Sequence, residues 1–183
     1  MGTPRKPPGR VIPYRRVAVV EFFDHSRYSS YGYGEDFSRA LAEKLADETA
    51  ATDVVLVPLA SLRDEHDPFV SGKMPLAVLV QVREECKADA MIMGSLDQIN
   101  PYRTPSVQIS LKFIDTATGR VLFSLSEQWD AGQKPVQRMM DAYCRRNHVS
   151  EDGRYGPDLV LNSPRYFLRF VADQMAPRII SSL

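Results

Sequence analysis

Residues 90–125, AMIMGSLDQINPYRTPSVQISLKFIDTATGRVLFSL, decide the fold class of this chain. The segment starts with a mainly apolar run over 90–96, which is typical of a short strand buried on both faces. After Pro105 the pattern changes to strict alternation of apolar and polar residues, which indicates strands with one face in water. Asp115 to Gly119 supplies turn residues between the two alternating runs, so an antiparallel hairpin is predicted over 107–125.

Two strand–helix units are predicted ahead of this segment. The β-branched run 16–23 predicts the first strand, and 53–57 predicts the second. The helix after the first strand has apolar residues every four positions, at Phe37, Leu41 and Leu45. The helix after the second strand begins at Pro75, and its residues at helical spacing are Leu76, Leu79, Val82 and Cys86. Because such crossovers are right-handed, we expect these two strands and 90–96 to run parallel. The segment Ser61 to Lys73 is predicted to be a charged loop.

The prediction for the whole chain is a single α/β domain. Its mixed sheet has about five strands in the order β-α-β-α-β-β-β, followed by C-terminal helices. One such helix is expected over 133–146, then a turn-rich stretch through Gly153 and Gly156, then a last helix capped by Ser163. The predicted segments are a flexible Pro- and Arg-rich arm at 1–15, the α/β domain at 16–131, and a helical extension at 132–183 packed on the same domain.

Composition limits the classes of function. The chain has 183 residues, and its 23 basic and 23 acidic side chains balance, so no global field attracts it to nucleic acid or to an anionic membrane. No run approaches the roughly 18 apolar residues that a membrane helix needs. Cys86 and Cys144 are too few for a disulfide framework and are predicted to be small buried hydrophobes or free thiols. A Pro-rich arm ahead of a compact domain often follows a removed signal or lipid anchor.

Three stretches of the chain carry a resemblance to a family group. They are VAVVEF at 17–22, KADAMIMGS at 87–95 and LKFIDTATGRVL at 111–122. In this order, across about residues 16–131, the chain resembles the amino-terminal domain of TolB and its relatives in bacterial envelope proteins, the CsgG–LpoB group of envelope lipoprotein domains. The resemblance implies an envelope location and a role in assembly or regulation. It implies no catalytic residues, because these motifs are structural.

Motifs for chemistry are weak. Gly32-Tyr33-Gly34 lies between a strand and a helix, but Phe37 replaces the third glycine of a dinucleotide loop, and Glu35 and Asp36 would repel phosphate. No nucleotide and no cofactor is therefore expected. Asp24-His25 and the run 64–67 follow neighbouring strands and could supply metal ligands, although short acidic loops are usually only solvated. His148 follows Cys144 by four residues but is expected to lie in solvent near Arg145 and Arg146.

The topology indicates where a site would lie. Ligands of open α/β sheets bind beyond the carboxyl ends of the parallel strands, where loops 24–34, 58–74 and 100–105 are expected. Tyrosine and arginine concentrate binding energy at interfaces. The candidate partner-binding residues in these loops are Tyr28, Tyr31, Tyr33, His66, Phe69, Tyr102 and Arg103. An equally open interpretation is that the tyrosines pack over the edge of the sheet or stiffen a loop.

The functional hypothesis is a non-enzymatic binding or assembly module of the bacterial cell envelope. It would be the soluble part of a periplasmic or outer-membrane lipoprotein, with a protein partner in the envelope and membrane contact only through a lipid anchor absent from this sequence. A cytoplasmic location is the alternative. Two further hypotheses are a metal-dependent hydrolase that uses loops 24–34 and 58–74, and a nucleic-acid-binding α/β domain. Neutral net charge and the lack of a basic aromatic face disfavour nucleic acid as a partner.

Overall fold

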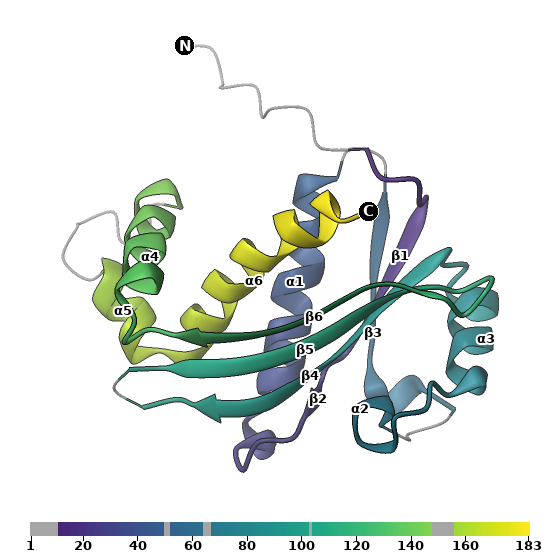
Figure 1. Ribbon diagram of the computed structural model, residues 1–183, viewed down its shortest axis with the longest axis horizontal. Coiled ribbons are helices and arrows are strands. Elements are labelled where there is room, and N and C mark those ends of the chain that lie inside the picture. Colours follow the sequence, from purple (N-terminus) through teal and green to yellow (C-terminus); the bar gives the residue numbers. More distant parts are fainter. Residues whose placement is uncertain (1–10, 50–51, 64–66, 103, 148–155) are drawn as a thin grey trace.

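The computed structural model describes residues 11–49, 52–63, 67–102, 104–147 and 156–183. These residues form a six-stranded mixed sheet with helices on both faces (Figure 1). The strands are β1 (Arg16–Val20), β2 (Phe23–Asp24), β3 (Asp53–Val57), β4 (Ala90–Asn100), β5 (Ser106–Asp115) and β6 (Val121–Asp130). The helices are α1 (Tyr33–Glu48), α2 (Pro68–Ser71), α3 (Leu76–Glu85), α4 (Lys134–Arg146), α5 (Gly156–Asn162) and α6 (Pro164–Ser181), with 3-10 turns η1 (Ser29–Tyr31) and η2 (Leu59–Ser61).

The strand order confirms the predicted topology. The order is β3-β1-β4-β5-β6, with the short β2 pairing beside β1 on β4. β1 pairs in parallel with both β3 and β4, whereas β4, β5 and β6 are antiparallel neighbours. Gly119 has a φ of 70°, the left-handed conformation that glycine adopts without strain, in the predicted β5–β6 turn.

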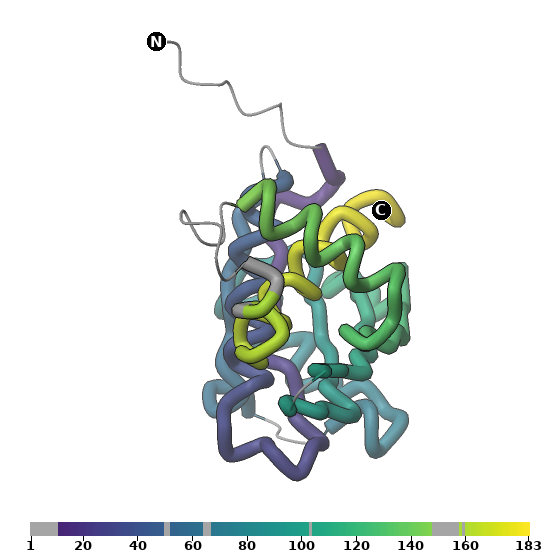
Figure 2. The backbone as a smooth tube through the Cα atoms, turned by 90° about the vertical axis from the view of Figure 1, so that its left-hand side faces the viewer, coloured from purple at the N-terminus to yellow at the C-terminus, as the bar shows by residue number. Residues whose placement is uncertain are grey.

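Helices cover the two faces of the sheet unequally. On one face, α1 and α6 bury Phe37, Leu41 and Phe170 against strand residues such as Ile92. Figures 1 and 2 place α4 and α5 together at the side of the domain far from α3. On the other face, α3 buries Val78, Leu79 and Val82 mainly against β1 and β4, with single residues of β3 (Val57) and β5 (Ile114) in the same cluster. The outer part of β5 and β6 therefore keeps one uncovered, polar face, as the alternation predicts.

The start of α1 is fixed against the chain that follows β1. The Phe22 amide donates a hydrogen bond to the buried Ser38 hydroxyl (2.8 Å), which in turn donates to the Gly34 carbonyl (2.7 Å). A Cβ atom on Gly34 would lie 2.3 Å from the Phe22 carbonyl oxygen, and one on Gly94 would lie 2.0 Å from the Phe22 ring. Gly34 is thus required by close packing rather than by a phosphate group.

A nearly buried carboxylate connects the helices of the α1–α6 face. Asp173, in α6, is 7% exposed and pairs with Lys44 of α1 and Arg146 of α4. Burial lowers the pKa of Lys44, but its hydrogen bonds to Asp173 and Glu48 outweigh this effect and raise it overall. The lysine therefore stays charged, and the C-terminal helices are joined to α1 by charge as well as by apolar packing.

Local details differ from the sequence predictions. The first strand is expected to reach Phe23 but splits into β1 and β2. The stretch predicted to be turn-rich contains α5, which starts at Gly156, because proline fits the first turn of a helix as well as it fits a turn. The loop predicted over 61–73 contains the short helix α2. Leu76 of α3 is 72% exposed rather than part of the apolar face. Both cysteines are free thiols.

Part of the predicted flexible arm lies on the domain. The Tyr14 ring is 5.3 Å from the Phe113 ring, centroid to centroid, and the Arg15 amide donates to the Asp89 carboxylate (3.0 Å). Ile12 also packs against the core. The prediction of flexibility for residues 1–10 falls outside the described residues.

Candidate functional site

Tyrosines from two distant segments meet at the end of the sheet where β4 turns into β5. The Tyr28 ring lies edge-on to Tyr31 (6.2 Å between centroids) and to Tyr102 (5.7 Å), and Tyr31 stacks on Tyr33 (5.8 Å, 12° between planes). We call these four residues the tyrosine cluster. Four of the seven sequence-predicted residues thus form one continuous group, even though Tyr102 is far from the other three in the sequence.

Hydrogen bonds hold the loop of the tyrosine cluster in one shape. The Asp24 carboxylate accepts from the Ser26 amide (2.8 Å), and the Ser26 hydroxyl accepts from the Tyr28 amide (3.1 Å). The His25 amide donates to the Leu96 carbonyl (3.0 Å), which joins the loop to β4. Gly32, at φ 72°, then lets the chain turn from η1 into α1. The rings are therefore presented by an ordered loop, which reduces the entropy lost on binding.

The members of the cluster differ in exposure. Tyr31 and Tyr102 are 57% and 60% exposed, whereas Tyr33 is 7% exposed and forms the base on which Tyr31 stacks. Burial, together with the nearby Tyr31 and Tyr102, raises the pKa of the Tyr33 hydroxyl. The Arg27 guanidinium lies 5.2 Å from the centre of the Tyr28 ring. The cluster presents two exposed aromatic rings and one arginine on a buried aromatic base.

The other predicted site residues do not all join this group. Phe69, in α2, is partly buried against the α3 side of the sheet, where the Lys112 ammonium lies 5.2 Å from its ring. Its packing places it with the second core cluster rather than with the tyrosines. His66 and Arg103 fall outside the described residues.

A polar network lies beside the cluster, in which the sequence analysis anticipated that His25 and Asp67 lie close together but missed Asp97. His25 contacts the carboxylates of Asp67 through Nε2 and of Asp97 through Nδ1, the latter at 3.4 Å. Asp97 also accepts hydrogen bonds from the hydroxyls of Ser95 and Ser110, both at 2.7 Å. Asp97 lies in a bulge, where the register of β4 and β5 shifts. The break in apolar–polar alternation at Asp97 was the available signal.

The network favours a charged imidazole. Burial lowers the pKa of His25, but the hydrogen bonds and negative charges of Asp67 and Asp97 outweigh it, so the pKa is raised overall. Both ring nitrogens are occupied by carboxylates, which leaves neither available to a metal ion. Among the residues that the structure describes, no group of three or more His, Cys, Asp and Glu side chains could hold a metal. Asp64, Glu65 and His66 of the metal hypothesis lie outside these residues.

In the described part of the chain, no helix combines the length and the apolar character that crossing a bilayer requires.

Comparisons with known proteins show similarity at the level of fold. No family model and no curated protein sequence matches this chain. Protein XCC0632 from Xanthomonas campestris superposes with a TM-score of 0.52 at 8% identity and covers 97% of this chain and 90% of its own. PelC from Paraburkholderia phytofirmans, solved as a dodecamer, gives 0.47 at 18% identity, covering 70% and 82%. The C-terminal domain of LpoB from Salmonella enterica gives 0.39 at 14% identity, covering 66% and 87%.

The similarity to XCC0632 extends over most of the chain. XCC0632 shares the fold over nearly the whole length of both chains, so the C-terminal helices are part of the shared architecture. The likeness to the TolB and CsgG–LpoB group rests on the sequence motifs. At 8% identity, the XCC0632 comparison establishes a common fold and leaves the function to the site.

Proposed function

We propose that this chain is a non-enzymatic binding module of the bacterial cell envelope that assists a larger complex, and that the tyrosine cluster is its partner-contact surface. The observation that carries the proposal is the convergence of Tyr28, Tyr31 and Tyr102 from two separate segments onto one exposed patch. Exposed rings of this size gain little by packing on each other alone. They gain more when a partner buries them.

The exposure of the tyrosine rings supports a binding role over a purely structural one. A lid over the sheet would bury its rings, as Tyr33 does, whereas Tyr31 and Tyr102 keep more than half of their surface in water. Arg27 adds a cation next to the rings. Aromatic side chains with an adjacent arginine are enriched at the centres of protein–protein interfaces.

The compartment part of the proposal rests on the sequence resemblance. Residues 17–22, 87–95 and 111–122 carry the motifs of the TolB and CsgG–LpoB group, whose members act in the envelope. In the structure these motifs form β1, the start of β4 and the β5–β6 hairpin, all of which build the sheet. The full-length gene expressed in its own host with an epitope tag should appear in the envelope fraction. Recovery in the cytoplasmic fraction would reject this part.

Photo-crosslinking in the native host tests the contact surface. A benzoylphenylalanine at position 31 should form a discrete adduct with an envelope protein. Tyr102→Ala in the same chain should weaken that adduct, because an anchor tyrosine contributes about 2 kcal/mol, roughly thirtyfold in affinity. Tyr102→Phe should retain most of it. The same probe at Gln128, an exposed position on β6, is the matched control.

Stability measurements distinguish the two interpretations of the tyrosines. If the cluster is a contact surface, Tyr102→Ala should leave the melting temperature of the purified protein nearly unchanged while the adduct is lost. A lower melting temperature with an undiminished adduct would mean that the rings only cover the sheet, and the proposal would be wrong.

A further inference from the structure

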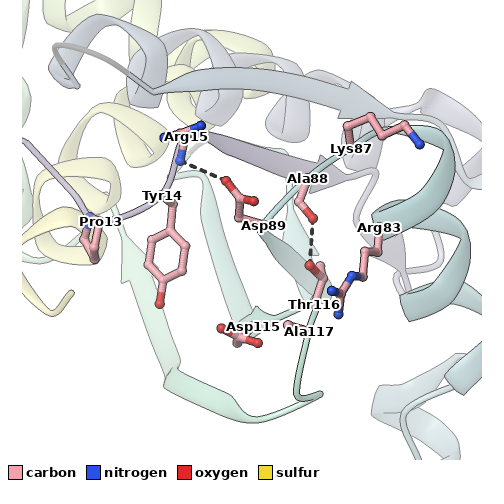
Figure 3. A pocket seen from close by; sticks show the side chains of 10 residues that line it. All are labelled: Pro13, Tyr14, Arg15, Arg83, Lys87, Ala88, Asp89, Asp115, Thr116 and Ala117. Carbon is pink, nitrogen blue, oxygen red and sulfur yellow. Dashed lines mark hydrogen bonds between the residues drawn. The ribbon is translucent and has the colours of Figure 1, made fainter.

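A pocket lies at the opposite end of the sheet from the tyrosine cluster. It has a volume of about 610 Å³, within the range of small-molecule sites. Its walls come from the chain before β1, from the end of α3 and from the β5–β6 hairpin (Figure 3). The lining residues are Pro13, Tyr14, Arg15, Arg83, Lys87, Ala88, Asp89, Asp115, Thr116 and Ala117.

Cationic side chains outnumber carboxylates in the lining of this pocket, since Arg15, Arg83 and Lys87 face Asp89 and Asp115. Each carboxylate uses one oxygen in hydrogen bonds: Asp89 Oδ2 accepts from the Arg15 and Arg16 amides (3.0 and 3.2 Å), and Asp115 Oδ1 accepts from the Thr118 amide and hydroxyl (2.8 and 2.9 Å). By contrast, the side chains of Arg15, Arg83 and Lys87 form no ion pair with any other described residue. The pocket is therefore complementary to an anion rather than to a cation.

A second pocket continues the first along α3. It has a volume of about 350 Å³ and shares Arg83, Thr116 and Ala117 with the first. Its other lining residues include Leu76 and Val80, which are 72% and 42% exposed although they belong to a helix with an apolar face in the core. Glu84 also lines it and would repel an acidic group there. Figure 3 shows the Arg83 guanidinium directed toward Thr116 and Ala117, where the two pockets meet.

Lys87 supplies an independent observation. Its φ of 55° is left-handed, and it is the one non-glycine residue with positive φ in the described part of the chain. Glycine is the relaxed choice at such a helix end, because a Cβ atom in this conformation costs free energy. Figure 3 shows Lys87 at the rim of the pocket, with its ammonium turned away from the other lining residues. A strained residue retained at the edge of a cavity is typical of a functional site.

We propose that the two pockets together bind an amphipathic organic anion, with its carboxylate or phosphate group beside Arg83 and Arg15 and its apolar chain against Leu76 and Val80. The unpaired cations select the charge of the ligand, and the exposed leucine and valine select its tail. Such a site is independent of the tyrosine cluster, so the proposal stands whether or not the cluster binds a protein.

Titration of the purified chain, followed by amide NMR, tests the proposal. Octanoate and octyl phosphate are the probes, and acetate, inorganic phosphate and octylammonium are the comparison ligands. We expect saturable shifts over residues 76–89 and 115–119 with at least one octyl anion, and the tighter of the two identifies the acid group. Acetate and phosphate should bind at least about tenfold more weakly because they lack the tail. Absence of saturable binding by both octyl anions, or equal binding of octylammonium, would overturn the proposal.

Exposed-residue variants separate the head and tail contacts without unfolding the protein. Arg83→Gln should weaken the octyl anion about tenfold or more, whereas Arg138→Gln, on exposed α4, should not change it. Leu76→Ser should weaken it about threefold, whereas Val70→Ser, equally exposed but outside both pockets, should not. Lys87→Gly should reduce affinity while the melting temperature holds or rises. Unchanged affinity in Arg83→Gln and Leu76→Ser would contradict the assigned site.

Discussion

The two ends of the sheet present opposite kinds of surface. At the end where β4 turns into β5, aromatic rings stand out on a hydrogen-bonded loop, with Tyr31 and Tyr102 mostly in water. At the end of the β5–β6 hairpin, the surface recedes into a pocket lined by unpaired cations. A projecting aromatic patch suits a large partner, and a charged hollow suits a small ligand. The two proposals therefore assign different kinds of recognition to opposite ends of one sheet.

The largest loss of stability is expected for Gly34→Ala, and its local effects test whether the two ends of the sheet are stabilised independently. Gly34→Ala places a methyl group 2.3 Å from the Phe22 carbonyl oxygen, which the backbone must move to avoid. We expect a loss of about 3 kcal/mol in the free energy of unfolding, measured by urea denaturation. Amide exchange should accelerate around the tyrosine cluster more than around residues 87–89. A loss below about 0.5 kcal/mol would show that this close contact is not needed.

A smaller effect is a pH-dependent change in stability, caused by His25 beside the tyrosine cluster. Because the pKa of His25 is raised in the folded chain, its ion pairs stabilise the protein fully below the unfolded value of about 6.5 and progressively less as pH rises through the folded value. His25→Gln should therefore cost about 1 kcal/mol at pH 5.5 and less at pH 9. Melting temperatures of both proteins at the two pH values measure this difference.

One result would contradict the predicted pH dependence of His25→Gln. The groups that face its ring are Asp67 from α2 and Asp97 from β4, and Asp24 precedes it on β2. If the cost of His25→Gln were the same at both pH values, the imidazole would contribute by packing alone. Arg39→Gln, which removes an exposed ion pair with Glu35 on α1, is the matched control and should change the melting temperature little at either pH.

The pocket end should show a gain in stability. Lys87→Gly removes the left-handed strain of a residue with a Cβ atom but adds freedom to the unfolded chain. The difference should leave the variant about 0.5 kcal/mol more stable, as measured by urea denaturation. Lys87→Ala keeps the strain and should give no gain. A stability gain together with weaker ligand binding would show that this end of the domain retains strain for function.

The smallest effect is expected at the exposed rings. Tyr31→Ala should change the free energy of unfolding by less than about 0.5 kcal/mol, because the ring is 57% exposed. Tyr33→Ala, by contrast, removes a ring that is 7% exposed and should cost about 3 kcal/mol. Similar losses in the two variants would mean that the cluster is one packed unit, and the distinction between exposed contact rings and a buried base would fail.

Sequence patterns captured the sheet because their signals are local. The alternation of Val107, Ile109 and Leu111 determines which face of β5 is buried, and no distant contact can reverse it. The end of each strand was less predictable: a bulge at Asp97 and the extension of β4 to Asn100 depend on the partner strand. Helix α5 was missed because Gly-Pro marks the start of a helix as readily as it marks a turn.

The sequence by itself determined the fold class, the parallel and antiparallel strands, and the loops that carry candidate residues. Only the tertiary structure decided which of those residues meet. The Tyr102 ring contacts the Tyr28 ring, whereas Phe69, predicted for the same surface, packs on the other side of the sheet. His25 lies between two carboxylates. The pocket around Arg83 likewise depends on three segments far apart in the chain. The reason is physical: periodicity sets the face of each element, but the twist of the sheet and the heights of its loops set the distances between side chains.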